Sequence, residues 1–148
     1  LAAWPEARGI GIDASAAALA VAQRNAAQLG LADRTQFRRG QWLAPLTVPL
    51  DMLVSNPPYL ASAELADLSP EVAAEPRVAL EGGADGLDAY RAIAAALPRA
   101  LLSGGRVLLE IGPTQGKAVA ALLTAAGLRD VAVHPDLDGR SRVVTARA

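Results

Sequence analysis

Short apolar runs alternate along the chain with stretches whose apolar residues recur at helical spacing. The first run covers residues 8–12 and ends at Asp13, and an alanine-rich stretch from Ser15 to Leu29 follows and stops at Gly30. Serine is a preferred N-cap residue, and glycine is preferred at the left-handed position that ends a helix. The pattern therefore predicts a strand, a turn and a helix in this order.

The same alternation predicts the elements of the remaining chain. They are a strand over 35–39, a strand covered on both faces over 50–55, a long loop over 59–87, a helix over 88–102 with a kink or break at Pro98, a strand over 106–111, a helix over 114–126, and two strands over 131–134 and 142–146. Asp138-Gly139 lies between the last two strands and is typical of a hairpin, so we expect an antiparallel pair. The alternation indicates a layered α/β fold with a mainly parallel sheet.

The composition narrows the class of protein. The chain has 148 residues, the length of one domain, and we expect residues 1–148 to form a single domain. Hydrophobic residues make up 52% of the chain but aromatic residues only 3%, so the core must be aliphatic. Lys and Arg number 14 and Asp and Glu 15, which gives a net charge of -1. This balance disfavours a nucleic-acid partner, because proteins that bind phosphate backbones carry a basic surface.

Cysteine is absent and His134 is the one histidine. Disulfides, thiolate metal sites and histidine clusters are therefore excluded, and we expect no metal. No apolar run approaches the roughly 18 residues that a membrane span needs, and no basic and then apolar leader opens the chain. These features predict a soluble cytoplasmic protein without a membrane partner.

Asp13 is the first candidate for a binding residue. It lies at the carboxyl end of a predicted strand, where a carboxylate in a nucleotide-binding α/β fold accepts hydrogen bonds from two neighbouring ribose hydroxyls. Asp is also favoured at the start of a helix without any ligand, because of the helix dipole. Gly9 and Gly11 lie inside the strand rather than in a turn after it, so they are not a phosphate-binding loop. We expect the cofactor loop to be missing from this chain.

The sequence Asn56-Pro57-Pro58-Tyr59 directly follows a predicted buried strand, where open α/β sheets bind their ligands. Each proline stiffens the turn and lacks an N–H group, so the carbonyl groups of the turn are not used by a helix. The side-chain oxygen of Asn56 and the carbonyl of Pro57 can each accept one N–H of a planar –NH2 group, on which Tyr59 can stack. The turn therefore favours an amide or exocyclic amine as substrate; a purely structural turn is the alternative.

Holding such a nitrogen in line with an electrophilic methyl group lowers the barrier to its methylation. An amide nitrogen is a poor nucleophile because its lone pair is delocalised, and acceptance of both its protons adds electron density during attack.

Three further features have weaker signals. Trp42 follows the predicted strand over 35–39 and is placed either to pack against an adenine or to fill a core. The segment over 81–86 is rich in glycine, but no strand directly precedes it, and we interpret it as a plain turn. His134 precedes Pro135 at a strand end, and we interpret it as structural because no Ser or Cys motif accompanies it.

The chain resembles the HemK-type glutamine amide-nitrogen methyltransferases, which act on peptide chain release factors and use S-adenosylmethionine. The resemblance is carried by residues 9–15, 53–59, Glu75-Pro76 with 79–87, Tyr90-Arg91, and Gly104-Gly105 with 109–112. It implies that Asp13 binds the ribose of the cofactor, that Trp42 lies by the adenine, and that Asn56 contacts both cofactor and substrate. It also implies that residues 56–59 hold the glutamine of a Gly-Gly-Gln loop.

The resemblance further implies a Rossmann-like, class I methyltransferase sheet with strand order 3-2-1-4-5-7-6. The family's first strand, its acidic glycine-rich cofactor loop and an N-terminal helical domain would precede Leu1, so we expect a truncated catalytic domain with a gap between strands two and four. Gln41 stands before Trp42, where the family usually has an acidic residue. The alternatives are methylation of a ribosomal protein glutamine or of a nucleic-acid amino group, and an inactive fragment that cannot bind cofactor.

Overall fold

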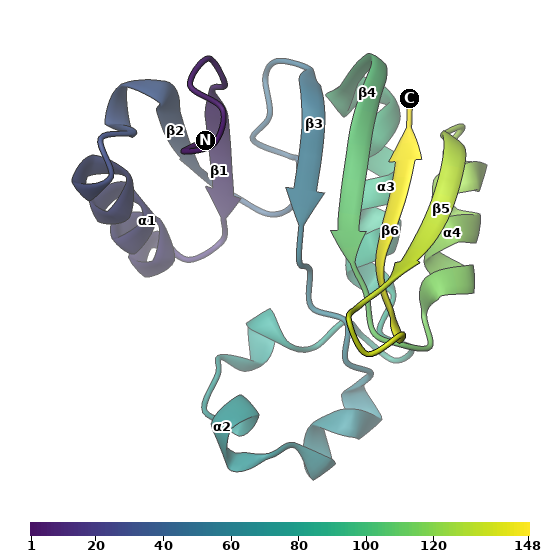
Figure 1. The fold of residues 1–148 in the computed structure, drawn as a ribbon. Coiled ribbons are helices and arrows are strands. Elements are labelled where there is room, and N and C mark those ends of the chain that lie inside the picture. Colours follow the sequence, from purple (N-terminus) through teal and green to yellow (C-terminus); the bar gives the residue numbers. More distant parts are fainter. The chain divides into compact units, whose positions relative to one another are not determined.

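A computed structural model describes residues 1–148 (Figure 1). Its helices and strands are β1 (Gly9–Asp13), α1 (Ala16–Gln28), β2 (Thr35–Arg39), β3 (Leu50–Ser55), α2 (Pro70–Ala73), α3 (Asp88–Ala100), β4 (Leu101–Glu110), α4 (Gly116–Ala125), β5 (Arg129–Pro135) and β6 (Ser141–Arg147). Short 3-10 helices cover Ala32–Arg34, Ser62–Asp67 and Arg77–Ala79. The chain divides into two compact units, Leu1–Thr47 and Val48–Ala148.

The first unit contains β1, α1 and β2. The two strands pair in parallel, with Gly9 opposite Thr35 and Asp13 opposite Arg39. The side chain of Ser15 caps α1 by accepting a hydrogen bond from the N–H group of Ala18, at 3.2 Å. Gly30 follows α1 with a φ of 67°, which is costly for residues with a Cβ atom. The predicted strand, cap, helix and glycine stop are therefore confirmed.

The second unit contains a four-stranded sheet in the order β3-β4-β6-β5. Strand β3 pairs in parallel with β4, whereas β6 is antiparallel to both β4 and β5. The predicted C-terminal hairpin is confirmed. Its second strand, β6, is the one that pairs with β4 and so joins the hairpin to the parallel β3–β4 pair. This order agrees with the last four strands, 4-5-7-6, of the seven-stranded order implied by the resemblance.

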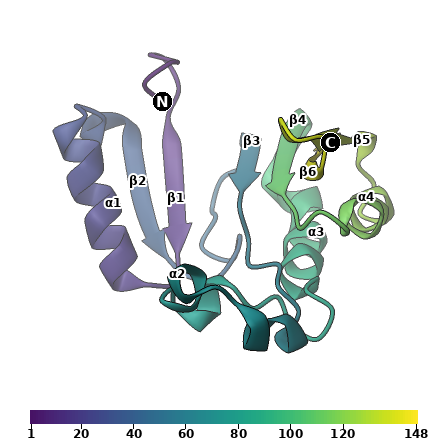
Figure 2. The ribbon, with the colours of Figure 1, turned by 60° about the horizontal axis from the view of Figure 1, so that its bottom comes forward.

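Helices α3 and α4 lie on the same face of this four-stranded sheet, as Figures 1 and 2 show from two directions. The core lies between this face and the two helices. Its largest fully buried side chains are those of Tyr90, Ile93 and Leu97 in α3, Val107 and Leu109 in β4, Ile111 directly after β4, Val119 and Leu123 in α4, and Val144 in β6. Burial of one such side chain stabilises the fold by roughly 1.5–3 kcal/mol. The core is aliphatic apart from one tyrosine, as the composition predicts.

Two predictions about these elements are wrong. Strand β3 is not covered on both faces, since the side chain of Val54 is 68% exposed. The reason is that β3 is an edge strand of its sheet and that α3 and α4 cover only the other face. Helix α3 is not broken at Pro98, because this proline lies in the last turn and the helix ends at Ala100.

Strand β4 begins earlier than expected, at Leu101, and includes Gly104-Gly105. Leu50 pairs with Leu101, and the next paired residues are Met52 on β3 and Arg106 on β4, so β4 has more residues than β3 between the two pairs. The extra residues form an irregular bulge, in which Gly104 has a φ of 78°. The two glycines therefore belong to a bulge in the strand and not to the end of the helix.

Candidate functional site

The turn Asn56–Tyr59 follows β3 at the point where β3 and β4 end together, with Ser55 opposite Leu109. Asn56 is exposed, Pro57 is buried, and Tyr59 is partly buried. The side chain of Asn56 is thus accessible to a ligand. The two prolines that follow it restrict the backbone of the turn, because each has a fixed φ angle. The predicted position of this turn at the carboxyl edge of a parallel strand pair is confirmed.

A residue that the sequence analysis did not single out, Gln115, holds the end of this turn. Its Nε2 atom donates hydrogen bonds to the carbonyl oxygens of Tyr59, at 2.8 Å, and of Gly86, at 3.2 Å. Its Oε1 atom accepts a hydrogen bond from the N–H group of Gly112, at 3.0 Å. In the sequence, Gln115 is the second residue of the helix predicted over 114–126 and follows Gly112-Pro113, a position that does not indicate its partners.

The segment after the turn is held by residues 80–83 of the long loop. The N–H group of Leu60 donates to the carbonyl of Leu80, at 3.0 Å, and the N–H group of Gly82 donates to the carbonyl of Leu60, at 2.8 Å. Ser62 donates likewise to the carbonyl of Gly83, at 2.9 Å. The glycine-rich segment is a turn, as expected, and it packs directly against the candidate site.

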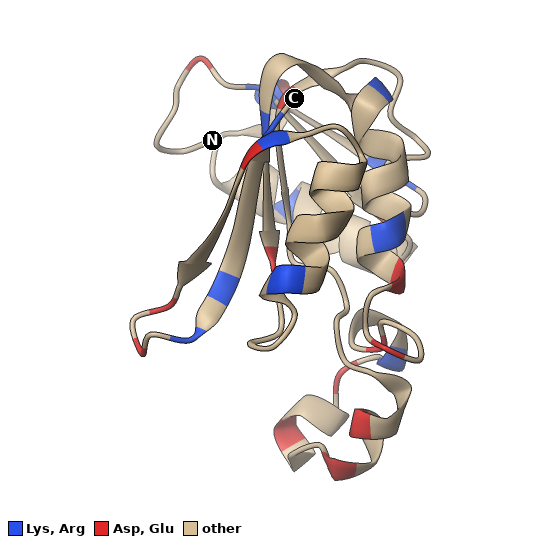
Figure 3. Cartoon of the chain, turned by 90° about the vertical axis from the view of Figure 1, so that its right-hand side faces the viewer, with Lys and Arg blue, Asp and Glu red and all other residues tan.

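The long loop carries a negative charge. Over residues 60–87 the acidic residues are Glu64, Asp67, Glu71, Glu75, Glu81 and Asp85, and the one basic residue is Arg77. Figure 3 shows acidic residues on the helical turns of this loop. Such a surface repels anions, which agrees with the interpretation of the segment 81–86 as something other than a phosphate-binding loop.

Two arginines order this loop through ion pairs. Arg77 contacts Glu81 at 2.6 Å, and the hydroxyl of Ser62 donates to the same carboxylate at 2.7 Å. The hydrogen bond from Arg77, followed by that from Ser62, lowers the pKa of Glu81 to about 2. Arg91 in α3 forms ion pairs with Asp85 and Asp88, and its hydrogen bond lowers the pKa of Asp85. The pair Tyr90-Arg91 of the family resemblance therefore contributes one core residue and one loop anchor.

Tyr90 is a buried residue close to Tyr59 of the candidate turn. Its side chain is fully buried, and its hydroxyl donates a hydrogen bond of 2.8 Å to the carbonyl of Glu110, at the end of β4. Burial, and then the nearby Tyr59 and Glu110, raise the pKa of the Tyr90 hydroxyl. The phenol therefore stays neutral at physiological pH and remains a donor.

Asp13 and Trp42 lie in the first unit, at the carboxyl ends of its two strands. The Oδ1 atom of Asp13 accepts a hydrogen bond of 2.7 Å from the N–H group of Ser15, and the carbonyl of Asp13 accepts one of 3.0 Å from Gly40. Trp42 is partly buried and has a φ of 51°. A bulky residue rarely adopts this conformation, and residues that do are frequent at binding sites. The structure thus brings Asp13 and the turn of Trp42 to one end of the β1–β2 pair, while their roles stay predictions.

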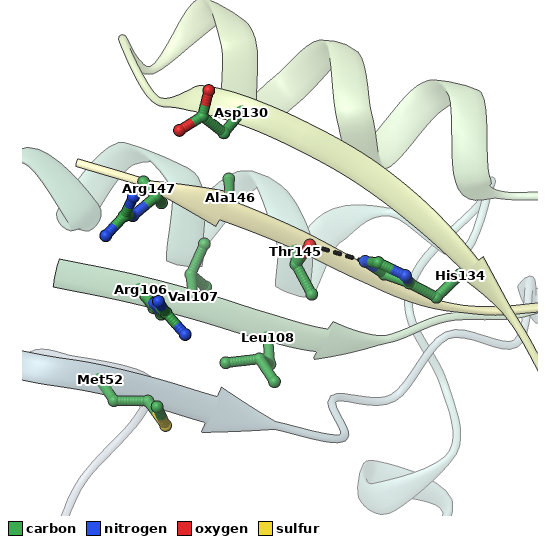
Figure 4. Close-up of a pocket in the computed structure, with 9 residues that line it drawn as sticks. All are labelled: Met52, Arg106, Val107, Leu108, Asp130, His134, Thr145, Ala146 and Arg147. Atoms are coloured by element: carbon green, nitrogen blue, oxygen red, sulfur yellow. Dashed lines mark hydrogen bonds between the residues drawn. The ribbon is translucent and has the colours of Figure 1, made fainter. Parts of the chain in front are cut away.

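A cavity of about 300 Å³ lies on the sheet of the second unit and is lined by Met52, Arg106, His134 and Arg147 among others (Figure 4). None of the predicted site residues lines it. His134 contacts the hydroxyl of Thr145 through Nε2, at 2.8 Å. The chain has no group of three or more acidic or histidine side chains arranged to bind a metal ion. None of its helices combines the length and the apolar character that crossing a membrane requires.

The strand order, the hairpin and the position of the turn define the fold as that of the class I methyltransferases. The chain superposes with a TM-score of 0.51 on a release-factor-specific protein-(glutamine-N5) methyltransferase from Alicyclobacillus acidocaldarius, at 24% identity, over 95% of this chain and 79% of that one. A family model described as RMKL-like, methyltransferase domain, matches residues 2–70.

Curated relatives are more similar in sequence. The chain is 57% identical to a release factor glutamine methyltransferase of Cereibacter sphaeroides, over 99% of this chain and 53% of the relative. It is 47% identical to a protein of the same name from Rhodospirillum rubrum, over 99% of this chain and 46% of the relative. The chain is therefore a homologue of the release factor glutamine methyltransferases and spans about half of their length.

Proposed function

We propose that this chain is part of the catalytic domain of an enzyme that methylates the side-chain amide nitrogen of a glutamine in a peptide chain release factor. The observation that carries the proposal is the anchored Asn56–Tyr59 turn at the end of β3, in a chain that is 57% identical to a protein named for this activity. The methyl donor is S-adenosylmethionine, which supplies an electrophilic methyl group when bound.

The residues of the turn bind and orient the substrate amide. The Asn56 side-chain oxygen and the Pro57 carbonyl each accept one N–H of the glutamine –NH2 group, and the Tyr59 ring packs on its plane. This arrangement aims the nitrogen at the incoming methyl group and increases its electron density. Bound S-adenosylmethionine would supply the methyl group to this nitrogen and would leave as S-adenosylhomocysteine, while the methylated amide would lose one proton to solvent.

The residues present in the first unit fit the donor's nucleoside. Only the Oδ1 atom of Asp13 is used within the chain, so the second carboxylate oxygen is available to ribose hydroxyls. Trp42 offers a partly exposed indole for adenine, and Asn56 is the residue proposed to contact both donor and substrate.

The substitution Asn56→Ala, made in the complete enzyme of which this chain is proposed to be a part, tests the proposed function. We expect methyl transfer to a release factor to fall by roughly 100-fold or more, as when a polar group is removed from a reaction centre, with no loss of fold because Asn56 is exposed. The measurement uses a methyl donor with a labelled methyl group, and thermal unfolding reports the fold. Asn25→Ala, at an exposed position of α1, is the matched control and should transfer at the unaltered rate.

The choice of acceptor distinguishes the substrates. A release factor, ribosomal proteins and DNA are offered in parallel, and label on the release factor alone is expected. Label on DNA or on a ribosomal protein in preference to the release factor would assign the turn to another amino group, and unchanged transfer by Asn56→Ala would remove Asn56 from the site.

A further inference from the structure

Gln115 uses its entire side-chain amide within the chain. Both hydrogens of Nε2 are directed to backbone carbonyls, those of Tyr59 and Gly86, and Oε1 accepts from Gly112. The backbone is fixed as well, because the N–H group of Gln115 donates to the carbonyl of Gly112 at 3.0 Å and its carbonyl accepts from Val119, in α4, at 3.0 Å. The side chain is thus a rigid connector at the start of α4 that joins three loops.

The position of this connector matters for the Asn56–Tyr59 turn. Upstream of the turn, the β3–β4 ladder holds Ser55. Downstream, Gln115 holds the carbonyl of Tyr59. Between these points Pro57 and Pro58 have fixed φ angles, so few torsions remain free. A displacement of the Tyr59 carbonyl is therefore passed back to the groups that face the substrate.

Close packing around the connector leaves it little room to move. A Cβ atom at Gly86 would lie 2.3 Å from the Tyr59 carbonyl oxygen and 2.6 Å from Nε2 of Gln115. A Cβ atom at Gly112 would lie 3.0 Å from Oε1 of Gln115 and 3.4 Å from the Tyr59 ring. Glycine at both positions lets the backbone approach the glutamine side chain.

We propose that Gln115 is a positioning residue for methyl transfer, which holds the Tyr59 carbonyl so that Asn56 and Pro57 keep the geometry that binds the substrate amide. The inference rests on the proposed function for its effect on catalysis. The role of Gln115 in holding the turn rests on the geometry alone, and the two parts are measured separately.

The sharpest variant is Gln115→Glu, which keeps the size of the side chain and an acceptor for Gly112 but removes both N–H donors. The carboxylate would face the carbonyls of Tyr59 and Gly86, and the turn would move. We expect kcat/KM for the release factor to fall about 10- to 100-fold, which corresponds to about 1.4–2.8 kcal/mol. Gln28→Glu adds the same charge at an exposed position of α1 and should leave kcat/KM unchanged.

A pH profile separates positioning from general destabilisation. Protonation of the new carboxyl restores one donor, so the activity of Gln115→Glu relative to the unaltered protein should rise as the pH falls toward 5. Gln115→Met removes the hydrogen bonds without a titratable group, and its relative activity should be low and independent of pH. A loss that is equal at all pH values in both variants would contradict a positioning role.

Amide hydrogen exchange measures the holding role without any assay of activity. In both variants we expect faster exchange at the amides of Leu60 and Gly82, whose hydrogen bonds hold the segment directly after Tyr59. Gln115→Met should also expose the Gly112 amide, which Gln115→Glu keeps bonded. Unchanged exchange at Leu60 and Gly82 in both variants would overturn the inference. If the unaltered protein methylates no release factor, the proposed function fails, and the exchange data still decide whether Gln115 holds the turn.

Discussion

Gly86 shows at the scale of one residue how closely the long loop approaches the turn. It has a φ of 72°, and an added Cβ atom would overlap the Tyr59 carbonyl. Gly127, after α4, has a φ of 86° and open space around its Cα atom. The two glycines therefore share the backbone strain that a substitution introduces and differ only in the overlap.

We predict that Gly127→Ala lowers the free energy of unfolding by roughly 1–2 kcal/mol, the cost of a left-handed conformation, and that Gly86→Ala lowers it by more and also impairs methyl transfer. Urea denaturation and the transfer assay measure the two effects. If both substitutions lower the free energy of unfolding equally and Gly86→Ala leaves methyl transfer unimpaired, the long loop shifts to accommodate the Cβ atom without moving the turn.

Glu81 provides a titration that reports the order of the same loop. Its pKa is about 2 in the folded chain, because Arg77 and Ser62 donate to the carboxylate. A lowered folded pKa means that the contribution to stability is present above the unfolded value, near 4.5, and is lost as the pH falls from there toward 2.

We predict that the Glu81 carboxyl stays ionised at pH 3.5, where an unperturbed glutamate is mostly protonated, and that Arg77→Gln raises its midpoint. Carbon-13 chemical shifts of the carboxyl group measure both. A midpoint near the ordinary value in the unaltered chain would mean that the Arg77–Glu81 pair does not persist in solution.

At the scale of elements, β3 and β4 show that adjacent strands in one sheet have different environments. Val54 on β3 is 68% exposed, whereas Leu109 on β4 is fully buried. Both strands consist mainly of apolar residues, and the apolar pattern alone predicted burial for each.

We predict that Leu109→Ala lowers the free energy of unfolding by about 2–5 kcal/mol, as expected for a large buried side chain, and that Val54→Thr changes it by no more than about 0.5 kcal/mol. Chemical denaturation of both variants measures the difference. A large loss in Val54→Thr would indicate that the exposed face of β3 is covered in solution.

At the scale of the whole molecule, buried apolar residues are unequally distributed. In Leu1–Thr47 the buried hydrophobic residues are Ala26 and Leu43, while all the largest buried side chains belong to Val48–Ala148. Local stability follows the amount of apolar surface that a segment buries. The single domain expected from the length of the chain therefore stays a prediction.

We predict that the amides of α1 exchange with solvent deuterium faster than those of α3, because α1 buries only Ala26 whereas α3 buries six residues. Exchange detected by mass spectrometry at neutral pH measures the difference. Equal protection of the two helices would show that residues 1–148 unfold as one cooperative domain.

The elements of the fold were largely predictable because their signals are local. Ser15 and Gly30 bound α1 through contacts with residues a few positions away, and Asp138-Gly139 marks the hairpin. The candidate turn was also predictable, since Asn56 to Tyr59 are consecutive and follow an apolar run. The predicted coverage of β3 and the predicted start of β4 failed because both depend on which other segments pack against a strand or pair with it. The predicted break at Pro98 failed because the helix ends shortly after this proline.

The sequence by itself determined the order of strands and helices, the aliphatic core and the identity of the turn. Only the tertiary structure decided that one face of β3 is open and that Gln115 holds Tyr59. Gln115 and Tyr59 are 56 positions apart in the chain. Periodicity records that a residue is buried or polar, but a hydrogen bond between distant residues depends on the folded path that brings them together.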